Sequence, residues 1–301
     1  MPKTAFLFPG QGSQKVGMGR DIYDASPSAR AVFDEADAVL EEALSLLCFD
    51  GPEESLNLTA NTQPAILTVS IALCKALGKQ PDVVAGHSLG EYSAHVVSGT
   101  LTFADAVRIV RKRGRYMQAA VPVGEGAMAA VLGANIEDVE HICELTHGVV
   151  SPANYNSPGQ VVIAGETEAV ARASEQLNAL GAKVRPLPVS APFHCALMLP
   201  AERALEADLR ASRFLEPQCP IYVNVDGAPV STGDAGREAL IQQVSRSVRW
   251  QQTIERMLAD GVEQFVEIGP GRVLTGLLSR IDKHARGISI QGPLDFDKLT
   301  N

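Results

Sequence analysis

Long apolar runs are absent from this chain. No stretch of about 20 consecutive apolar residues exists, so the sequence contains no candidate transmembrane helix. The apolar run nearest the N-terminus covers only residues 5–8, which is too short for the core of a secretory signal peptide. We therefore expect a cytoplasmic protein that does not use a membrane as a partner.

Cysteine is also scarce. The chain has five cysteines, an odd number, and no two of them form a C-x-x-C pair. This pattern predicts free thiols in a reducing compartment, without a disulfide framework or a zinc site. Cys195 directly follows His194, but neighbouring side chains usually point apart, so the pattern disfavours a cysteine nucleophile there. The five are Cys48, Cys74, Cys143, Cys195 and Cys219.

Positive charge is in the minority. The chain has 26 Lys and Arg against 35 Asp and Glu, a net charge of −9. An acidic chain is poorly suited to non-specific binding of nucleic acid or anionic lipid, although a local basic patch for an acidic partner stays possible. The 301 residues, 46% hydrophobic and 20% charged, are typical of a globular protein with one large domain or a large domain carrying a smaller one.

Short apolar runs alternate with longer helical patterns through most of the chain. This alternation predicts an α/β fold with a largely parallel sheet. We expect strands at residues 4–8, 82–86, 219–225 and 264–268, and helices at 64–77, 90–98, 103–120, 237–245 and 254–259. The residues after Lys283 show no clear pattern, and we expect them to be weakly structured and to end in a tail.

The middle of the chain has a different pattern. Strands are expected at 127–132, 149–154, 160–164 and 183–189, and helices at 136–146 and 167–180. The order βαββαβ is the split unit of ferredoxin-like domains. We therefore expect a small domain inserted at 123–190, and a discontinuous large domain made of 1–122 and 191–301.

The pentapeptide Gly86-His87-Ser88-Leu89-Gly90 fits the G-x-S-x-G pattern. It follows a predicted strand and opens a predicted helix, which is the setting of a nucleophile elbow. Such a turn exposes the Ser88 hydroxyl, and the Leu89 amide beside it can stabilise an oxyanion. The alternative is a glycine-rich turn with a purely structural role.

A serine nucleophile needs a base, and six histidines compete for that role. His194 lies just after the predicted inserted domain, and ligand sites favour such junctions. His194 is therefore the preferred base, with a core histidine satisfied by a backbone carbonyl as the alternative. The other five are His87, His95, His141, His147 and His284.

The first predicted strand ends in the glycine-rich loop Phe8-Pro-Gly-Gln-Gly-Ser-Gln14. A phosphate-binding loop is a weak interpretation, because G-K-[ST] is missing and Lys15 stands where a dinucleotide fingerprint needs glycine. Gly269-Pro-Gly271 near the C-terminus does not match these phosphate-binding patterns either. The Gln11 backbone amide is better interpreted as the second oxyanion donor, which an elbow requires from a separate loop.

The predicted helix at 103–120 carries five basic residues: Arg108, Arg111, Lys112, Arg113 and Arg115. For most of them we expect an ordinary solvated helix face. One arginine that points into a cleft could bind a carboxylate through its bidentate guanidinium.

Six ordered motifs carry a family resemblance. They read GQGSQ, GHSLGEYSA, RGRYMQ, NSPGQVVIAG, PFHCALM and EIGPG. With these motifs the chain resembles the malonyl-CoA:acyl-carrier-protein transacylase family over roughly residues 4–282. The resemblance implies an α/β-hydrolase-like large domain with an inserted ferredoxin-like domain. It also implies a Ser–His dyad without a carboxylate as third member.

The resemblance also assigns roles by motif. Ser88 would be the nucleophile and His194 the base, and Arg113 would bind the free carboxylate of the substrate. Gln11 and Leu89 would supply the oxyanion amides, and Gln63 would be a further pocket residue. The Gln243 carbonyl would orient the histidine, although residues 243–248 depart from the usual segment with Asn-Pro.

The implied reaction transfers malonyl from malonyl-CoA to the phosphopantetheine thiol of an acyl carrier protein, by ping-pong chemistry through a malonyl-Ser ester. It needs no metal or cofactor, and we expect a monomer in fatty-acid or polyketide synthesis.

Phe193, directly before His194, resembles the residue found at this position in malonyl-selective polyketide acyltransferases. Lys183 and Arg185, on the last expected strand of the inserted domain and near the predicted cleft, are candidates for docking the acidic carrier. The alternatives are an acyl hydrolase acting on stalled carriers and a non-catalytic carrier-binding module.

Overall fold

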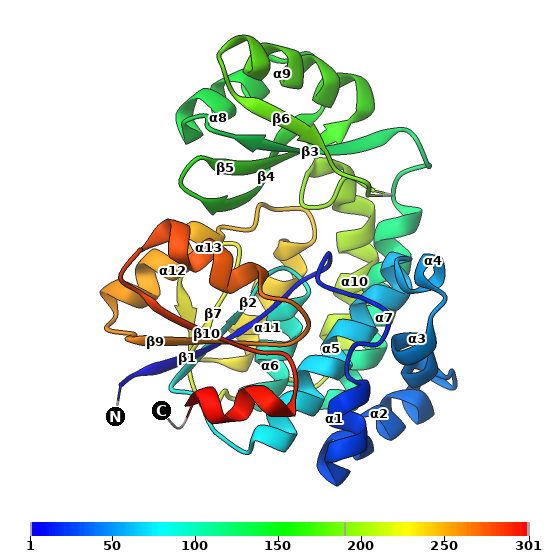
Figure 1. Cartoon of the computed structure of the whole chain (residues 1–301). Helices are drawn as coiled ribbons and strands as arrows, with labels where there is room; N and C mark the ends of the chain where they lie inside the picture. Colours follow the sequence, from blue (N-terminus) through cyan, green and yellow to red (C-terminus); the bar gives the residue numbers. More distant parts are fainter. Residues whose placement is uncertain (1, 190, 300–301) are drawn as a thin grey trace.

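The computed structural model describes residues 2–189 and 191–299. The chain forms two β-sheets, one in a large body and one in a smaller layer above it (Figure 1). Within the described residues, no helix is both long and apolar enough to span a membrane. All five cysteines are free thiols.

The larger sheet has the strand order β10-β9-β1-β2-β7-β8. All neighbouring strands are parallel except β8, which is antiparallel to β7. The confirmed fold class is therefore α/β with a mainly parallel sheet. The strands are β1 (Thr4–Phe8), β2 (Val83–Gly86), β7 (Ile221–Tyr222), β8 (Pro229–Val230), β9 (Gln264–Ile268) and β10 (Arg286–Ile290).

Helices cover both faces of this sheet, so its central strands are apolar on both sides. In β1, Phe6 and Phe8 face one core while Ala5 and Leu7 face the other. The first core lies against α1 (Arg20–Ala25), α2 (Pro27–Leu40), α3 (Leu44–Asp50), α4 (Glu53–Leu56), α5 (Thr59–Leu77), α6 (Gly90–Val97), α7 (Phe103–Ala119), α10 (Leu199–Ala211) and α11 (Gly233–Gln243). The second lies against α12 (Trp250–Ala259) and α13 (Val273–Ile281).

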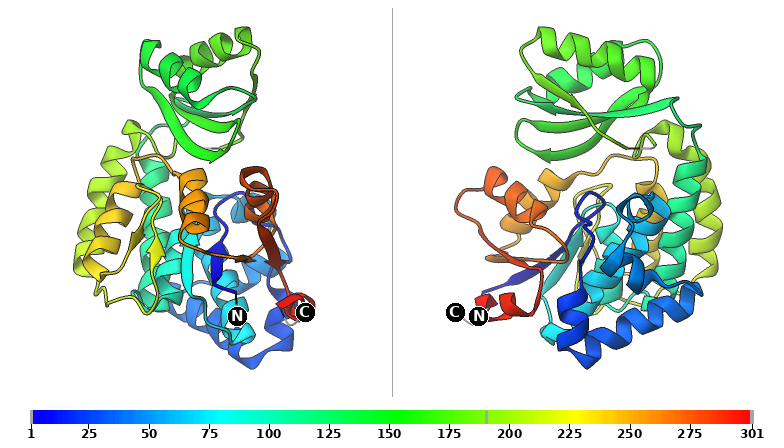
Figure 2. Two further views of the ribbon diagram at one scale, coloured as in Figure 1. Left: turned by 90° about the vertical axis from the view of Figure 1, so that its left-hand side faces the viewer. Right: turned by 45° about the vertical axis from the view of Figure 1, so that its right-hand side comes forward.

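The smaller sheet is antiparallel, with the order β4-β5-β3-β6. Its two helices pack on one face, and the other face turns toward the large body (Figure 2). Side chains alternate accordingly: Val161 and Ile163 face the helices, whereas Val162 and Ala164 join the main core. The elements are β3 (Gly126–Leu132), α8 (Ile136–Leu145), β4 (Val150–Ser157), β5 (Gln160–Glu166), α9 (Thr167–Ala179) and β6 (Lys183–Pro186).

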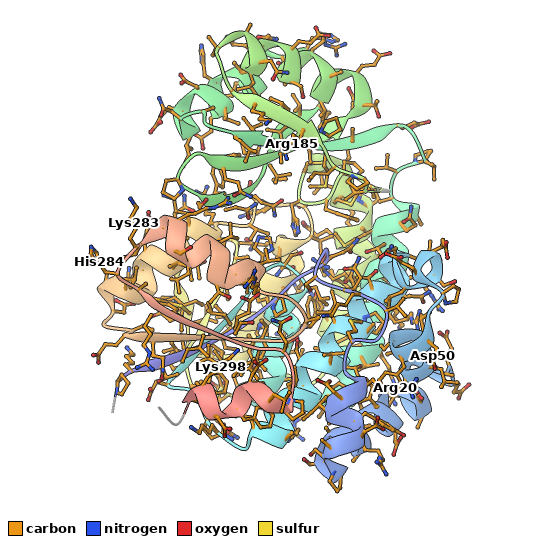
Figure 3. All side chains as sticks on the ribbon, in the orientation of Figure 1. Arg20, Asp50, Arg185, Lys283, His284 and Lys298 are labelled. Carbon is orange, nitrogen blue, oxygen red and sulfur yellow. The ribbon has the colours of Figure 1, made fainter. Side chains whose placement is uncertain are left out.

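The observed βαββαβ order is the predicted one. The unit spans residues 126–186, inside the range of 123–190, and the exact domain boundaries stay a prediction. Lys183 and Arg185 both lie exposed on β6; Figure 3 labels Arg185. A docking role for them also stays a prediction.

The expectation for the C-terminal region is wrong. Residues after Lys283 form β10, which pairs with β9, and then the 3-10 helix η2 (Pro293–Leu299). Ile288 and Ile290 are buried there, at 9% and 0% exposure. The two isoleucines alternate with Gly287 and Ser289, which is the two-residue period of a strand. The pattern has only two apolar residues and follows a basic segment, so it does not predict a strand by itself.

Other differences concern element ends. The expected strand at 219–225 is reduced to β7, and residues 223–225 continue without strand pairing. The expected helix at 237–245 begins earlier, at Gly233, where Thr232 caps it by accepting a hydrogen bond from the Ala235 amide. The expected strand at 149–154 extends further, because Asn156 and Ser157 also belong to β4.

Gly90 provides a test of how tightly the elbow is packed. A Cβ atom at Gly90 would lie 2.0 Å from the Phe8 carbonyl oxygen, part of the central strand β1. Gly90→Ala should therefore reduce the free energy of unfolding by about 3 kcal/mol or more. Gly276→Ala is the matched control, because a Cβ on this α13 glycine meets nothing within 4 Å.

Urea unfolding followed by circular dichroism measures both effects. Gly276→Ala should stabilise the protein by about 0.5–1 kcal/mol, as alanine does in a helix. A Gly90→Ala protein as stable as wild type would show that the close approach of α6 and β1 does not constrain the fold.

Candidate active site

Ser88 lies in a sharp turn between β2 and α6. Its φ of 51° is left-handed, which is uncommon for a residue with a side chain. The turn requires glycine on both sides, because a Cβ at Gly86 would lie 1.9 Å from the Gly90 carbonyl carbon. The Ser88 amide donates to Asn224 Oδ1 at 2.7 Å, which helps to hold the strained residue. The predicted strand–turn–helix setting of Ser88 is therefore present.

His194 lies directly beside the serine hydroxyl. Ser88 Oγ and His194 Nε2 are 2.7 Å apart. On the other side of the ring, His194 Nδ1 is 2.8 Å from the Gln243 carbonyl oxygen. A carbonyl can only accept, so Nδ1 carries the proton and Nε2 is free to accept one from Ser88. Among the described residues no carboxylate contacts this histidine, and a backbone carbonyl fixes its tautomer.

The surroundings of His194 keep its imidazole neutral. Burial, with a smaller contribution from the Arg113 guanidinium, lowers the pKa of His194 to about 3. The side chain is 4% exposed, and its backbone φ of 61° is left-handed like that of Ser88. A neutral imidazole at this position has the protonation state that a general base requires.

Arg113 is a buried cation at the base of the site, with 2% exposure. Nη1 donates to Gln63 Oε1 at 2.8 Å, and Nη2 donates to Gln243 Oε1 at 2.9 Å and to Ser88 Oγ at 3.1 Å. The Tyr92 ring lies 5.5 Å from the guanidinium carbon. Nε has no hydrogen-bond partner among the described residues. Although burial lowers its pKa, an arginine stays protonated in a protein.

The two predicted oxyanion donors face the same space. Gln11 and Leu89 both line the cavity in front of Ser88. In the described part of the chain, neither backbone amide has a hydrogen-bond acceptor. The Gln11 side chain is fixed by Thr59 Oγ1, which donates to Gln11 Oε1 at 2.6 Å and accepts from Gln63 Nε2 at 3.1 Å. Two free amides near a nucleophile are what an oxyanion hole requires.

A polar network beneath the nucleophile includes two residues that the sequence analysis missed. Glu91 and Asn224 are both 0% exposed. Asn224 bonds to the Ser88 amide and, through Nδ2, to the Gly86 carbonyl at 2.7 Å. The Gln243 side chain donates from Nε2 to the Ser88 carbonyl at 3.0 Å and to Glu91 Oε2 at 2.9 Å. Glu91 belongs to the GHSLGE motif, but Asn224 has no local signal in the sequence.

Gln243 therefore contacts the site in two ways. Its backbone carbonyl accepts from His194, as the resemblance implies, and its side chain contacts Arg113 and Ser88 as well. The residue is 0% exposed at the end of α11. The departure of residues 243–248 from the usual Asn-Pro segment does not displace this carbonyl.

His87 also borders the site. Its Nε2 lies 2.9 Å from Asn156 Oδ1 on β4, and its ring packs 5.5 Å from the Trp250 ring. Burial lowers the pKa of His87. The contact with Asn156 links the elbow to the smaller sheet.

A cavity of about 500 Å³ lies in front of the dyad. Its polar base consists of Ser88, His194 and Arg113. Loops and helices of the large body form part of its walls, together with Met128 and Asn154 of the smaller sheet. The walls contain Gln11, Gly12, Gln14, Asn57, Gln63, His87, Leu89, Met117, Met128, Asn154, Leu187, Pro188, Val189 and Phe193. All seven predicted site residues are thus in the cavity wall or, for Gln243, in direct contact with it.

The remaining candidates lie elsewhere. His95 is buried beside Thr100, while His141 and His147 belong to α8 and the segment after it. Figure 3 shows His284 with Lys283 at the surface after α13. The Cys195 thiol donates to the Pro192 carbonyl at 3.0 Å, and burial raises its pKa to about 11, so a thiolate is disfavoured.

The other basic residues of α7 are already paired. Arg111 is buried between Glu42 and Asn61, which departs from the expected solvated face. Three more form ion pairs: Arg108 with Asp105, Lys112 with Asp208 and Arg115 with Glu42. Within residues 2–189 and 191–299, no group of three or more His, Cys, Asp or Glu could hold a metal ion.

This geometry agrees with comparisons to known proteins. Residues 5–290 match the family model described as the acyl transferase domain. The chain belongs to this acyl transferase family. It is 51% identical over 288 residues to the malonyl CoA-acyl carrier protein transacylase of Escherichia coli, covering 93% of each chain. Identity to the enzyme of that name from Bacillus subtilis is 48% over 301 residues, covering 97% of this chain and 95% of the relative.

Solved structures of similar proteins superpose on this chain over almost its whole length. An acyl carrier protein S-malonyltransferase from Vibrio cholerae superposes with a TM-score of 0.96 at 46% identity, covering 99% of both chains. A malonyl-transacylase solved in complex with its type II PKS acyl-carrier protein has a TM-score of 0.97 at 45% identity. That superposition covers 99% of this chain and 100% of the other. The predicted family and the inserted-domain fold class are therefore confirmed.

The coupling between Arg113 and His194 can be measured in this acyl transferase without substrate. Arg113→Ala removes a buried positive charge next to the imidazole, so the pKa of His194 should rise from its low value. Side-chain NMR titration reports that pKa, and a His194→Gln variant identifies the signal. Arg111→Ala is the control, because Arg111 is buried on the same helix but bonds to Glu42. Equal pKa values in wild type and Arg113→Ala would contradict this coupling.

Proposed function

We propose that this acyl transferase moves the malonyl group of malonyl-CoA to the phosphopantetheine thiol of an acyl carrier protein, through an ester on Ser88. The observation that carries the proposal is the position of Arg113. It is a buried cation at the base of the cavity, and its Nη2 lies 3.1 Å from the nucleophilic oxygen. A thioester that carries a free carboxylate fits such a site better than a neutral acyl group.

In the first half-reaction, Ser88 Oγ attacks the thioester carbonyl while His194 Nε2 takes the hydroxyl proton. The 2.7 Å contact between these atoms is the distance that such a transfer needs. The tetrahedral oxyanion is stabilised by the amides of Gln11 and Leu89. The carbon–sulfur bond then breaks, His194 returns the proton to sulfur, and CoA leaves as a thiol.

The second half-reaction runs the same chemistry in reverse. The phosphopantetheine thiol transfers its proton to His194 and attacks the malonyl ester. Collapse of the second tetrahedral intermediate breaks the bond to Ser88 Oγ, which recovers its proton from His194. The two products are malonyl carrier protein and free enzyme, as ping-pong kinetics require.

Arg113 has donors available for the malonyl carboxylate. Its guanidinium has five N–H donors, and three are used by Gln63, Gln243 and Ser88. Nε is buried without a described partner, which is a cost that an incoming carboxylate can remove. We propose that Gln63 orients the guanidinium from the opposite side. Phe193 in the cavity wall is consistent with malonyl selection.

Two other functions remain as outcomes of the tests. An acyl hydrolase would use water as second acceptor, and it has less need of a cation that binds a substrate carboxylate. A non-catalytic carrier-binding module has no need of a hydroxyl and an imidazole 2.7 Å apart. The five free thiols fit a reducing cytoplasm, which we propose as the location of the protein.

Ser88→Ala tests the covalent step. Without the hydroxyl no ester can form, so intact mass spectrometry after mixing with malonyl-CoA should show no adduct. His194→Ala should still acylate, but about 10²–10⁴-fold more slowly, since it removes the general base. His95→Ala is a matched control of a buried histidine outside the site, and it should acylate at the wild-type rate. A malonyl adduct of normal yield on Ser88→Ala would exclude this nucleophile.

Arg113→Ala tests the carboxylate contact and separates a malonyl transferase from a hydrolase of neutral acyl groups. The kcat/KM for malonyl-CoA should fall by about tenfold or more, because the substrate carboxylate loses its partner. The kcat/KM for acetyl-CoA should hold or rise. Arg113→Lys should restore malonyl transfer only in part, since lysine lacks the bidentate fork.

Arg111→Ala is the control for helix damage and should keep the wild-type ratio of malonyl to acetyl transfer. A ratio near one in the wild-type enzyme, or a ratio that Arg113→Ala does not lower, would argue for the hydrolase instead.

A further inference from the structure

Glu91 is a buried carboxylate that the proposed mechanism leaves without a task. It lies three residues after Ser88 on α6 and is 0% exposed. Its Oε2 accepts from the Asn224 backbone amide at 2.8 Å and from Gln243 Nε2 at 2.9 Å. Its Oε1 accepts from no described residue. A half-satisfied buried carboxylate is costly, so an explanation beyond structural support is needed.

The Gln243 side chain joins Glu91 to Arg113. Its Nε2 donates to the carboxylate, and its Oε1 accepts from Arg113 Nη2 at 2.9 Å. Among the described residues, the guanidinium also donates hydrogen bonds to the neutral side chains of Gln63 and Ser88. The Glu91 charge raises the pKa of Arg113, although the larger effect of burial lowers it. Glu91 is thus the counter-charge of Arg113, separated from it by one amide.

Few other charges face Glu91. Helix α6 packs against β1, β2, α5 and α7. The strands β1 and β2 contain no ionisable residue, and those of α5 are Cys74 and Lys75 near its far end. Arg113 faces Glu91 from α7. Asp226, which follows β7, adds a smaller repulsion, and the neighbouring Tyr92 is buried and neutral.

These surroundings place Glu91 close to its titration point at neutral pH. Burial is the largest effect and raises the pKa of Glu91 to about 7, opposed by the bonds from Gln243 and Asn224 and by the Arg113 charge. A second anion bound to Arg113 would weaken that opposing attraction and favour the protonated form further. The unoccupied Oε1 is an atom that can accept the proton without breaking either hydrogen bond.

We propose that Glu91 is a positioning residue that sets how strongly Arg113 attracts the carboxylate of the substrate, and that Glu91 takes up a proton when the malonyl group binds. Ionised Glu91 competes with the malonyl carboxylate for the guanidinium charge. Protonated Glu91 leaves that charge to the substrate. The inference rests on the proposed malonyl transfer and deepens it, because it makes substrate selection depend on pH.

The sign of the pH dependence follows directly. Below its pKa Glu91 is protonated and neutral, so no buried anion offsets the positive charge of Arg113. The preference for malonyl-CoA over acetyl-CoA is then greatest. As pH rises through neutrality, Glu91 ionises and the preference for malonyl over acetyl falls. His194 and Ser88 act on both substrates, so their contributions cancel in the ratio of the two kcat/KM values.

The test is this ratio for malonyl-CoA over acetyl-CoA, measured between about pH 6 and pH 8.5 around the titration range. In the wild-type enzyme it should fall by about tenfold, the effect of one pKa unit of coupling between neighbouring charges. Glu91→Gln should keep the ratio high and constant with pH. Gln can place its oxygen at Oε2, retaining both hydrogen bonds, while its amide nitrogen takes the unoccupied place of Oε1.

Glu267→Gln is the matched control. Glu267 is also 0% exposed, but it lies on β9 and accepts from the Leu274 and Thr275 amides. This variant should show the same fall in the ratio as the wild type. A constant ratio in the wild-type enzyme, or a pH-dependent ratio retained in Glu91→Gln, would overturn the proposal.

A measurement on the unmodified enzyme covers the case in which Glu91→Gln does not fold. Near pH 7, the acylation burst with malonyl-CoA should take up more protons from an indicator solution than the burst with acetyl-CoA. Equal uptake would overturn the role of Glu91. If Arg113→Ala still lowers the malonyl preference, malonyl transfer stands and only the role of Glu91 is wrong; if it does not, the proposed function fails first.

Discussion

A positive charge buried at the base of a cavity is the constraint on which the site depends. Arg113 is almost fully enclosed, and a buried guanidinium must be satisfied by polar partners. Those partners are the Gln63 and Gln243 side chains and the Ser88 hydroxyl, from three different segments. The same charge contributes to the low pKa of His194, which keeps the base neutral. Arg113 thus affects the nucleophile, the base and, in the proposed mechanism, the choice of substrate.

The fold brings these groups together at the ends of parallel strands. Ser88 follows β2, the Gln11 loop follows β1, and Asn224 follows β7. Carboxyl ends of neighbouring parallel strands meet at one edge of a sheet, where ligands bind in open α/β folds. His194 and the cavity wall at 187–189 come from the segment that returns from the smaller sheet. Both members of the dyad have left-handed backbones, at φ 51° and 61°, which tight packing of the surrounding chain maintains.

Much of the fold and of the candidate site could be predicted from the sequence, because several of the patterns that define them are local. The elbow has a local signature, so Ser88 and Leu89 could be located from strand, glycine and helix patterns alone. The βαββαβ unit alternates clearly enough to be recognised. Asn224 and the roles of Glu91 could not be predicted, because they depend on contacts across 133 to 152 positions of sequence. The strand β10 was missed because its stability comes from pairing with β9, and two alternating isoleucines are too short a pattern to show it.

The central claim is that the Arg113 guanidinium binds the free carboxylate of the acyl group carried by Ser88. The most direct measurement is a crystal structure of the enzyme trapped after reaction with malonyl-CoA. The account predicts an ester on Ser88 Oγ, with the malonyl carboxylate within hydrogen-bond distance of Arg113 and the ester carbonyl oxygen on the amides of Gln11 and Leu89. A malonyl carboxylate that points instead toward Gln14 and Asn57 at the cavity wall, leaving Arg113 bonded only to protein groups, would contradict it.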